Sequence, residues 1–202
     1  KILFLENVKN FERHDKGHTL EVVLSTLDKI GYNTYYKVLN ASNFGIPQKR
    51  ERIYFISILK NYKNSSFTFP NNININSKLF DYILPDEETK KYILKRKDIF
   101  LKEHVHVDID MFGNYPQKPI RVGIVNKGGQ GERIYHECGH AITLSAYGGG
   151  AGAKTGLYLI NGKIRKLAPR ECARIMGYPD NFKIDKSRSE ERRVGKECTV
   201  LC

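Results

Sequence analysis

Apolar and polar positions in the first sixty residues change between strand-like and helix-like spacing. The continuous apolar run at residues 2–5 is typical of a buried parallel strand. Residues 19–30 place apolar side chains at helical intervals, and Gly31 follows at a position suited to end a helix. Residues 32–39 and 52–59 have the pattern of two further strands. This order predicts the second half of a doubly wound α/β domain.

The pattern changes after residue 60. Residues 60–80 are rich in Asn and Ser and predict a polar connection at a domain boundary. Residues 81–101 contain a short predicted helix with Pro85 near its start, followed by a basic stretch. That stretch is either a solvated face or a row of phosphate contacts.

Turn residues mark the last third of the chain. The dipeptide at residues 161–162, Asn-Gly, follows an apolar run at residues 157–160 and predicts a β-hairpin. Pro169 and Gly177 suit the first position and the C′ position of a short helix. Ala168 would be a poor N-cap for that helix.

Residues 121–150 hold eight of the seventeen glycines, and six of these form two clusters, at 128–131 and 148–150, that flank two short strand-like runs. Glycine allows a close approach of backbone to a ligand, so one interpretation is a pair of loops that meets DNA. The other is two hairpin loops in which glycine serves turn geometry alone. The candidate DNA-binding residues are Lys127, Gln130, Arg133, Thr143, Tyr147, Gly148 and Gly149.

Composition narrows the class of protein. The net charge is +12, which favours a polyanionic partner without separating nucleic acid from an anionic membrane surface or mere solubility. No apolar run approaches the roughly 18 residues of a membrane span, and no signal peptide is evident. The four cysteines have no metal-ligand spacing, and His104 and His106 have no third ligand in view, so we predict no metal and a reducing cytoplasm.

Three charged residues stand next to predicted strands. Glu6 follows the first apolar run, and ligands of open α/β sheets bind beyond the carboxyl ends of strands. Arg50 and Arg52 would share one face if their segment is extended. A helix cap or a solvated loop acid explains Glu6 equally well, and a solvated charge run explains the arginines.

Three segments in order, FLENV, GIPQKRER and RKLAPRECARIMGYPD, resemble motifs of the bacterial DNA cytosine-5 methyltransferases. The resemblance covers about residues 1–185. It implies the C-terminal half of a Rossmann-like, S-adenosylmethionine-dependent catalytic domain at residues 1–81 and a small, mostly β target-recognition domain at 82–168. The third motif and a hinge would occupy 169–185, and 186–202 would be a charged tail of unrelated origin.

The resemblance also implies roles. Glu6 would hold the N3 and N4 edge of a flipped cytosine, Arg52 would contact its O2, and Arg50 would brace the pocket. Gln130 would enter the space left by the flipped base, and Arg133 would read a guanine. Residues 121–150 are most similar to the branch of the family that modifies the inner cytosine of GCGC.

The wider setting follows from the same resemblance. It implies double-stranded DNA as substrate, a cytoplasmic monomer, and a restriction–modification system in which a cognate endonuclease would be a partner. Thr143 and Tyr147 would contact DNA or support the glycine loops. Arg165 and Arg170 would be structural or face phosphates.

The sequence also departs from the family's pattern. The family's Gly-rich cofactor loop and Pro-Cys nucleophile precede the ENV segment, and neither is present here. None of the four cysteines follows a proline. We therefore expect this chain to be an inactive fragment when alone. The alternative is a non-catalytic, sequence-specific DNA-binding protein derived from a methyltransferase.

Overall fold

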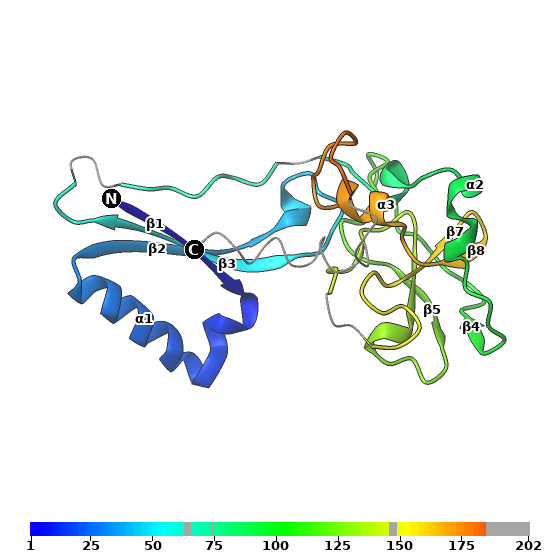
Figure 1. The fold of residues 1–202 in the computed structure, drawn as a ribbon, viewed down its shortest axis with the longest axis horizontal. Helices are drawn as coiled ribbons and strands as arrows, with labels where there is room; N and C mark the ends of the chain where they lie inside the picture. Colours follow the sequence, from blue (N-terminus) through cyan, green and yellow to red (C-terminus); the bar gives the residue numbers. More distant parts are fainter. Residues whose placement is uncertain (63–65, 74, 146–148, 185–202) are drawn as a thin grey trace. The chain divides into compact units, whose positions relative to one another are not determined.

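The computed structural model describes residues 1–62, 66–73, 75–145 and 149–184. The chain forms two compact units, which are coloured along the sequence in Figure 1. The first contains residues 1–44 and 50–74, and the second contains residues 45–49 and the chain from Ile75 onward. No helix in the described residues is long and apolar enough to cross a membrane.

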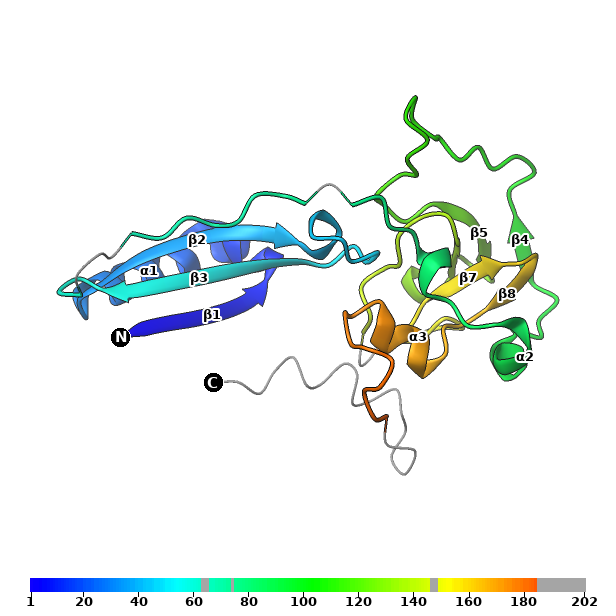
Figure 2. The same ribbon diagram turned by 90° about the horizontal axis from the view of Figure 1, so that it is seen from above.

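The first unit is a three-stranded sheet with one helix. Strands β1 (Ile2–Val8), β2 (Tyr32–Asn40) and β3 (Glu51–Leu59) lie in the order β1-β3-β2, and both pairings are antiparallel. Helix α1 (His18–Lys29) follows the 3-10 segment η1 (Lys9–Gly17) and lies along one face of the sheet (Figure 2). A further 3-10 turn, η2, spans Ala41–Asn43.

The core of this unit lies between α1 and the sheet. Leu20 of α1 packs with Ile53 and Phe55 of β3, all nearly inaccessible to solvent. Gly31 has φ +91° just beyond α1, which confirms the predicted C′ glycine. The predicted helix and strands are thus confirmed.

The first strand was predicted to be a buried strand with parallel neighbours, and this prediction was wrong. β1 pairs antiparallel with β3, and most of its side chains are exposed. The strand lies at the edge of the described sheet because β3 runs back between β1 and β2. An apolar run indicates a strand, but it does not reveal the direction of the strand beside it.

The second unit contains a five-stranded sheet. Its strands follow one another in chain order, with β6 and β7 parallel and the other pairs antiparallel. The elements are η3 (Leu79–Tyr82), α2 (Asp86–Thr89), η4 (Lys90–Tyr92), β4 (Ile99–Leu101), β5 (Arg121–Val125), η5 (Gln130–Glu132), β6 (Arg133–His136), β7 (Leu157–Ile160), β8 (Lys163–Arg165) and α3 (Pro169–Arg174). The family's mixed α/β architecture with a small, mostly β unit is therefore present.

Two turns confirm the sequence-based predictions. Asn161 and Gly162 both have positive φ between β7 and β8, the geometry of a type I′ hairpin. Pro169 is the first residue of α3, and Gly177 has φ +85°. Of the two strand-like runs between the glycine clusters, the first is β6, whereas the second forms only an isolated bridge at Ala141.

Helix α3 is held by a buried carboxylate. Glu171 forms a two-fold ion pair with Arg165, at 2.7 and 2.8 Å, and both side chains are almost inaccessible. Its oxygens also accept the backbone N–H groups of Ala168 at 2.6 Å and Leu84 at 2.8 Å. Glu171 thereby replaces the cap that Ala168 lacks, and it joins α3 to β8 and to the segment before α2.

Candidate active site and nucleic-acid interface

Glu6 and Arg52 form an ion pair on neighbouring strands. The β1–β3 register places Glu6 opposite Tyr54 and Val8 opposite Arg52, so all four side chains share one face of the sheet. Arg52 Nε donates to Glu6 Oε1 at 2.8 Å, and Arg52 Nη1 donates to the Glu51 carbonyl at 2.8 Å. A carboxylate and a guanidinium are thus fixed side by side, each partly exposed.

This pair has the hydrogen-bonding character that a cytosine edge needs. A carboxylate oxygen accepts from the N4 amino group, and a guanidinium donates to O2. The structure therefore brings together two of the three residues predicted for the chemistry.

Arg50 is fixed through its backbone. Its N–H donates to Asn40 Oδ1 at 3.0 Å, and its carbonyl accepts from Ala41 N at 3.0 Å. Asn40 Oδ1 also accepts from Ser42 N at 3.3 Å. Sequence reasoning missed Asn40, and no motif marks it, since its partner Arg50 is ten residues away in the chain.

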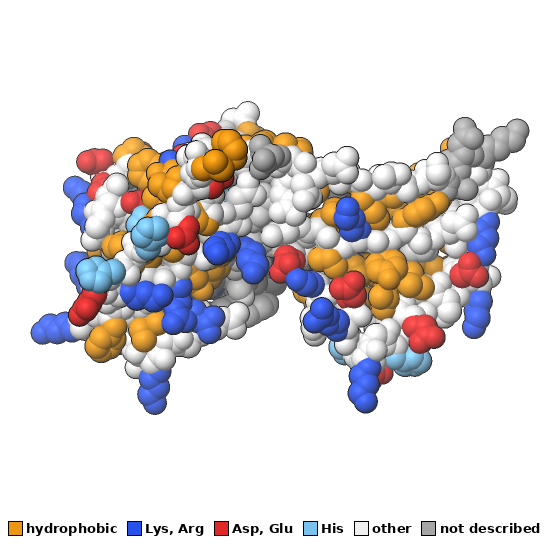
Figure 3. All heavy atoms as spheres, turned by 180° about the vertical axis from the view of Figure 1, so that it is seen from behind, with side chains coloured by type: hydrophobic (Ala, Val, Ile, Leu, Met, Phe, Trp, Pro, Cys, Tyr) orange, Lys and Arg blue, Asp and Glu red, His pale blue; other side chains and the backbone are white. Residues whose placement is uncertain are grey.

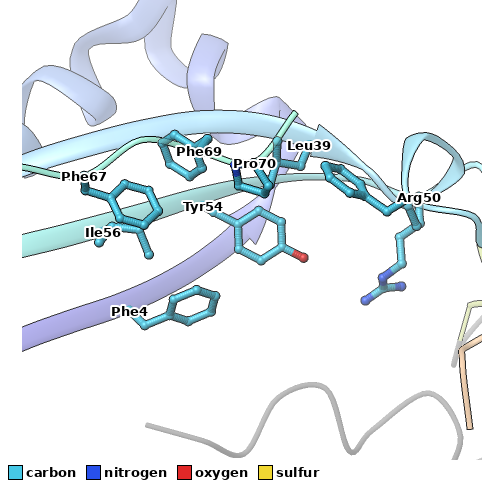
Figure 4. Close-up of a pocket in the computed structure, with 10 residues that line it drawn as sticks. Phe4, Leu39, Arg50, Tyr54, Ile56, Phe67, Phe69 and Pro70 are labelled. Atoms are coloured by element: carbon cyan, nitrogen blue, oxygen red, sulfur yellow. The ribbon is translucent and has the colours of Figure 1, made fainter. Parts of the chain in front are cut away.

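Arg50 lies at one end of a cavity of about 370 Å³ on the face opposite α1 (Figure 4). The Tyr54 hydroxyl points toward this end, and aromatic rings from four segments form most of the wall. The lining residues are Phe4, Leu39, Ala41, Phe44, Arg50, Tyr54, Ile56, Phe67, Phe69 and Pro70. Alternation along 52, 54 and 56 could have placed Tyr54 beside Arg52, but Phe67 and Phe69 come from the segment read only as a polar connection.

In the second unit, the two glycine clusters meet backbone to backbone. Gly152 N donates to the Gly131 carbonyl at 2.7 Å, and a Cβ on Gly131 would lie only 1.7 Å from the Gly149 carbonyl oxygen. The φ of Gly131 is not positive, so turn geometry does not require glycine there. Glycine is required there because the two backbone segments approach each other closely. This favours a pair of loops that pack together over two independent hairpin turns.

The loop before β6 is pinned by Glu132. Its carboxylate accepts from Asn126 Nδ2 and from Gly129 N, each at 2.9 Å, and these two bonds lower the pKa of the Glu132 carboxyl group. Lys127 and Gln130 are exposed on this loop. Arg133 is half-buried, and its Nε has no hydrogen-bond partner among the described residues. Tyr147 and Gly148 lie outside the described residues.

The Thr143 side chain makes a hydrogen bond within the second unit. Its hydroxyl donates to the Lys49 carbonyl at 2.6 Å, beside two backbone bonds that join Ala141 to Pro47 and Lys49. The GIPQKRER segment is therefore divided: residues 45–49 belong to the second unit, and Arg50 and Arg52 to the first. Thr143 supports this frame; its predicted contact with DNA remains a prediction.

Neither the distribution of charged side chains nor the potential metal ligands narrows down the position of the functional site. On the face shown in Figure 3, Lys and Arg side chains are spread among acidic and apolar ones instead of forming one patch. Within the described ranges, no group of three or more His, Cys, Asp or Glu could hold a metal ion. His106 pairs with Asp108 at 2.8 Å.

Comparison with known proteins gives the family. The profile described as C-5 cytosine-specific DNA methylase matches residues 1–198. The type II methyltransferase M.HhaI of Haemophilus parahaemolyticus is 52% identical over 190 residues, covering 94% of this chain and 56% of the relative. M.NgoBI of Neisseria gonorrhoeae is 34% identical over 197 residues, covering 96% of this chain and 55% of the relative. The chain thus spans about half the length of these curated relatives.

Solved structures agree on the fold. The S. pombe Dnmt2 methyltransferase matches with a TM-score of 0.60 and 17% identity, covering 96% of this chain and 59% of that chain. The Entamoeba histolytica methyltransferase EhMeth matches with a TM-score of 0.61 and 16% identity, covering 97% and 57%.

Proposed function

Because this chain belongs to the C-5 cytosine-specific DNA methylase family, we propose that it is part of an enzyme that methylates C5 of a flipped cytosine in double-stranded DNA. The observation that carries this proposal is the Glu6–Arg52 pair, fixed at 2.8 Å on adjacent strands. Chemistry at a ring carbon requires the base to leave the duplex, and a pocket that grips its Watson–Crick edge serves that purpose.

In this pocket, each charged group has a separate task. Glu6 accepts from N4 and favours protonation at N3 as a nucleophile adds to the ring, so its stabilisation grows toward the transition state. Arg52 donates to O2 and holds Glu6 in place. Arg50, anchored by Asn40, braces the entrance. The nucleophile itself is assigned to no cysteine of this chain.

S-adenosylmethionine would supply the methyl group. The aromatic cavity of the first unit does not fit it, because the charged group there is the Arg50 guanidinium, which would repel a sulfonium cation. We therefore assign no residue of this chain to the cofactor and derive no step through it.

We further propose that the loop pair of the second unit reads the target sequence, with GCGC as the target. Arg133 is half-buried at the start of β6 and carries a guanidinium, the group suited to a guanine, and Gln130 is exposed three residues earlier. The proposed contact set also contains Lys127, Thr143 and Gly149, together with Tyr147 and Gly148, which lie outside the described residues. We also propose that the domains end at residues 81, 168 and 185 and that the protein is a monomer. A cognate endonuclease would belong to the same restriction–modification system.

A non-catalytic, sequence-specific DNA-binding protein is the second candidate, and the packed glycine loops of the second unit would serve it equally well. The Glu6–Arg52 pair argues against it, because a protein that only reads the groove has no need of a base pocket.

A chimera separates the two candidates. Residues 1–184 of this chain replace the matching stretch of M.HhaI, and bisulfite sequencing follows methylation of a plasmid. We expect 5-methylcytosine at GCGC. DNA binding without any methylation, while M.HhaI made in the same way is active, would contradict the enzymatic proposal. Methylation at a different sequence would overturn the GCGC target alone.

A further inference from the structure

The segment that leads into the second glycine cluster is held in place without belonging to a regular strand. Within residues 141–145, the only sheet-like pairing is an isolated bridge at Ala141. The backbone N–H groups of this segment are therefore held one at a time. Ala141 N donates to the Pro47 carbonyl at 2.7 Å, and Ser145 N donates to the Lys154 carbonyl at 2.9 Å.

A tyrosine side chain holds an N–H group that lies between these two. Ile142 N donates to the Tyr158 hydroxyl oxygen at 3.1 Å. Tyr158 lies on β7 and is fully buried, with its ring in a hydrophobic core cluster of the second unit. Gly156 leaves room for this contact, because a Cβ there would lie 2.9 Å from Ile142 Cδ1 and 3.1 Å from the Tyr158 hydroxyl oxygen. One hydroxyl group thus ties the segment to a strand of the sheet.

Burial alone offers another explanation for this bond, because a buried tyrosine hydroxyl usually finds a hydrogen-bond partner. That explanation predicts a contribution to stability and none to DNA recognition. The neighbouring Tyr135 shows that this core does not impose such a bond. Its ring centre lies 6.1 Å from that of Tyr158, and its hydroxyl makes no hydrogen bond to any residue that the structure describes. The bond of Tyr158 is therefore a feature of its place opposite Ile142.

We infer that Tyr158 is a positioning residue for sequence recognition: its hydroxyl fixes the backbone of residues 141–145 and thereby the second glycine cluster. The inference rests on the proposal that the loop pair reads the target. Gly149 of this cluster meets Gly131 of the first cluster backbone to backbone, so a displaced segment would disturb both loops. Hydrogen bonds to base edges need short distances and good alignment, so a small displacement is enough to reduce discrimination.

The test removes a single oxygen atom. Tyr158→Phe keeps the ring in the core and deletes the hydroxyl that accepts from Ile142 N. Competition binding gives the ratio of the chain's affinities for a GCGC duplex and a scrambled duplex. Tyr158→Phe should lower this ratio by on the order of fivefold, about the effect of losing one neutral hydrogen bond. Tyr135→Phe is the matched control and should leave the ratio unchanged within about twofold.

Hydrogen exchange provides a second readout, without DNA. The backbone amides of residues 141–145 should exchange faster in Tyr158→Phe than in the unmodified chain, whereas the amides of β7 should keep their protection. A role in core stability alone would instead raise exchange throughout the second unit and leave the affinity ratio unchanged. Far-ultraviolet circular dichroism of each variant confirms that the chain is folded.

The two readouts separate a failure of this inference from a failure of the proposed function. A ratio that is preserved in Tyr158→Phe, or lowered equally by Tyr135→Phe, would overturn the inference, and so would unchanged exchange at residues 141–145. An unmodified chain without any preference for GCGC would remove the proposed recognition and, with it, any role of Tyr158 in recognition. Exchange at residues 141–145 would then still show whether Tyr158 holds the segment.

Discussion

Among single side chains, Glu6 bears most directly on the proposed chemistry. Its Oε1 is held by Arg52 Nε, so a change at Glu6 alters a charge whose position is already set. Glu6→Gln keeps an acceptor oxygen but loses the negative charge. In the chimera, we expect turnover to fall by roughly 10²–10³-fold, with DNA affinity changed far less. Single-turnover methylation and a binding titration measure the two effects, and unchanged turnover would remove Glu6 from the mechanism.

His140 makes a separate prediction about pH. It is fully buried, its Nε2 donates to the Ser77 carbonyl at 2.8 Å, and burial lowers the pKa of its ring. The unfolded chain therefore takes up the proton at a higher pH than the folded chain does. The stability that the folded chain gains by keeping His140 neutral is fully present above the ordinary histidine pKa of about 6.5. It is lost as the pH falls toward the lowered pKa of the folded state.

Thermal unfolding at pH 7.5 and 5.5 measures this effect. The fall in Tm between the two pH values should be smaller in His140→Gln than in the unmodified chain. His104→Gln is the control, because His104 is exposed, and it should keep the full fall. Equal falls in all three proteins would show that His140 does not carry the pH dependence.

At the scale of elements, α3 depends on one buried ion pair. Removing one partner leaves the other charge buried without compensation, and such changes cost about 3–5 kcal/mol. We expect Glu171→Ala to lower the free energy of unfolding by that amount, because it also frees the N–H groups of Ala168 and Leu84. Denaturant titration provides the value.

Asp180→Ala is the control for this prediction. Asp180 pairs with Arg174 at 2.7 Å but is 63% exposed, so water replaces the lost contact and the change should be much smaller. Comparable losses in the two variants would contradict the importance assigned to burial of the Arg165–Glu171 pair.

The glycine loops form the second prediction at this scale. Gly131→Ala would force the Gly149 segment away, whereas a Cβ on Gly149 meets open space and its φ is not positive. Gly131→Ala should therefore abolish preference for GCGC over other DNA, and Gly149→Ala should retain it. Competition binding measures both variants, and a preserved preference in Gly131→Ala would mean that the loop contact does not serve recognition.

At the scale of the whole molecule, the sequence predicted where each element lies in the chain better than it predicted which segments pack beside that element. Asn161-Gly162 and Pro169 specify turn and helix geometry through their own backbone preferences, and both predictions are confirmed. The direction of β1's partner and the attachment of residues 45–49 to the second unit depend on hydrogen bonds to distant segments. No periodicity within either segment encodes those bonds.

The candidate site shows the same division. The motifs singled out Glu6 and Arg52, and the strand register joins them. Asn40 and the aromatic rings of Phe67 and Phe69 were missed because their roles arise only when the chain folds around β3. The roles of the DNA-contacting residues stay predictions.

The central claim is that this chain reads a specific DNA sequence with its second unit. Its most direct test is a titration of the chain against a GCGC duplex and a scrambled duplex at two salt concentrations. We predict a preference for GCGC that persists at the higher salt and that Arg133→Ala reduces by roughly 1–3 kcal/mol. Equal, salt-sensitive binding to both duplexes would contradict the claim, because it would leave only the +12 charge at work.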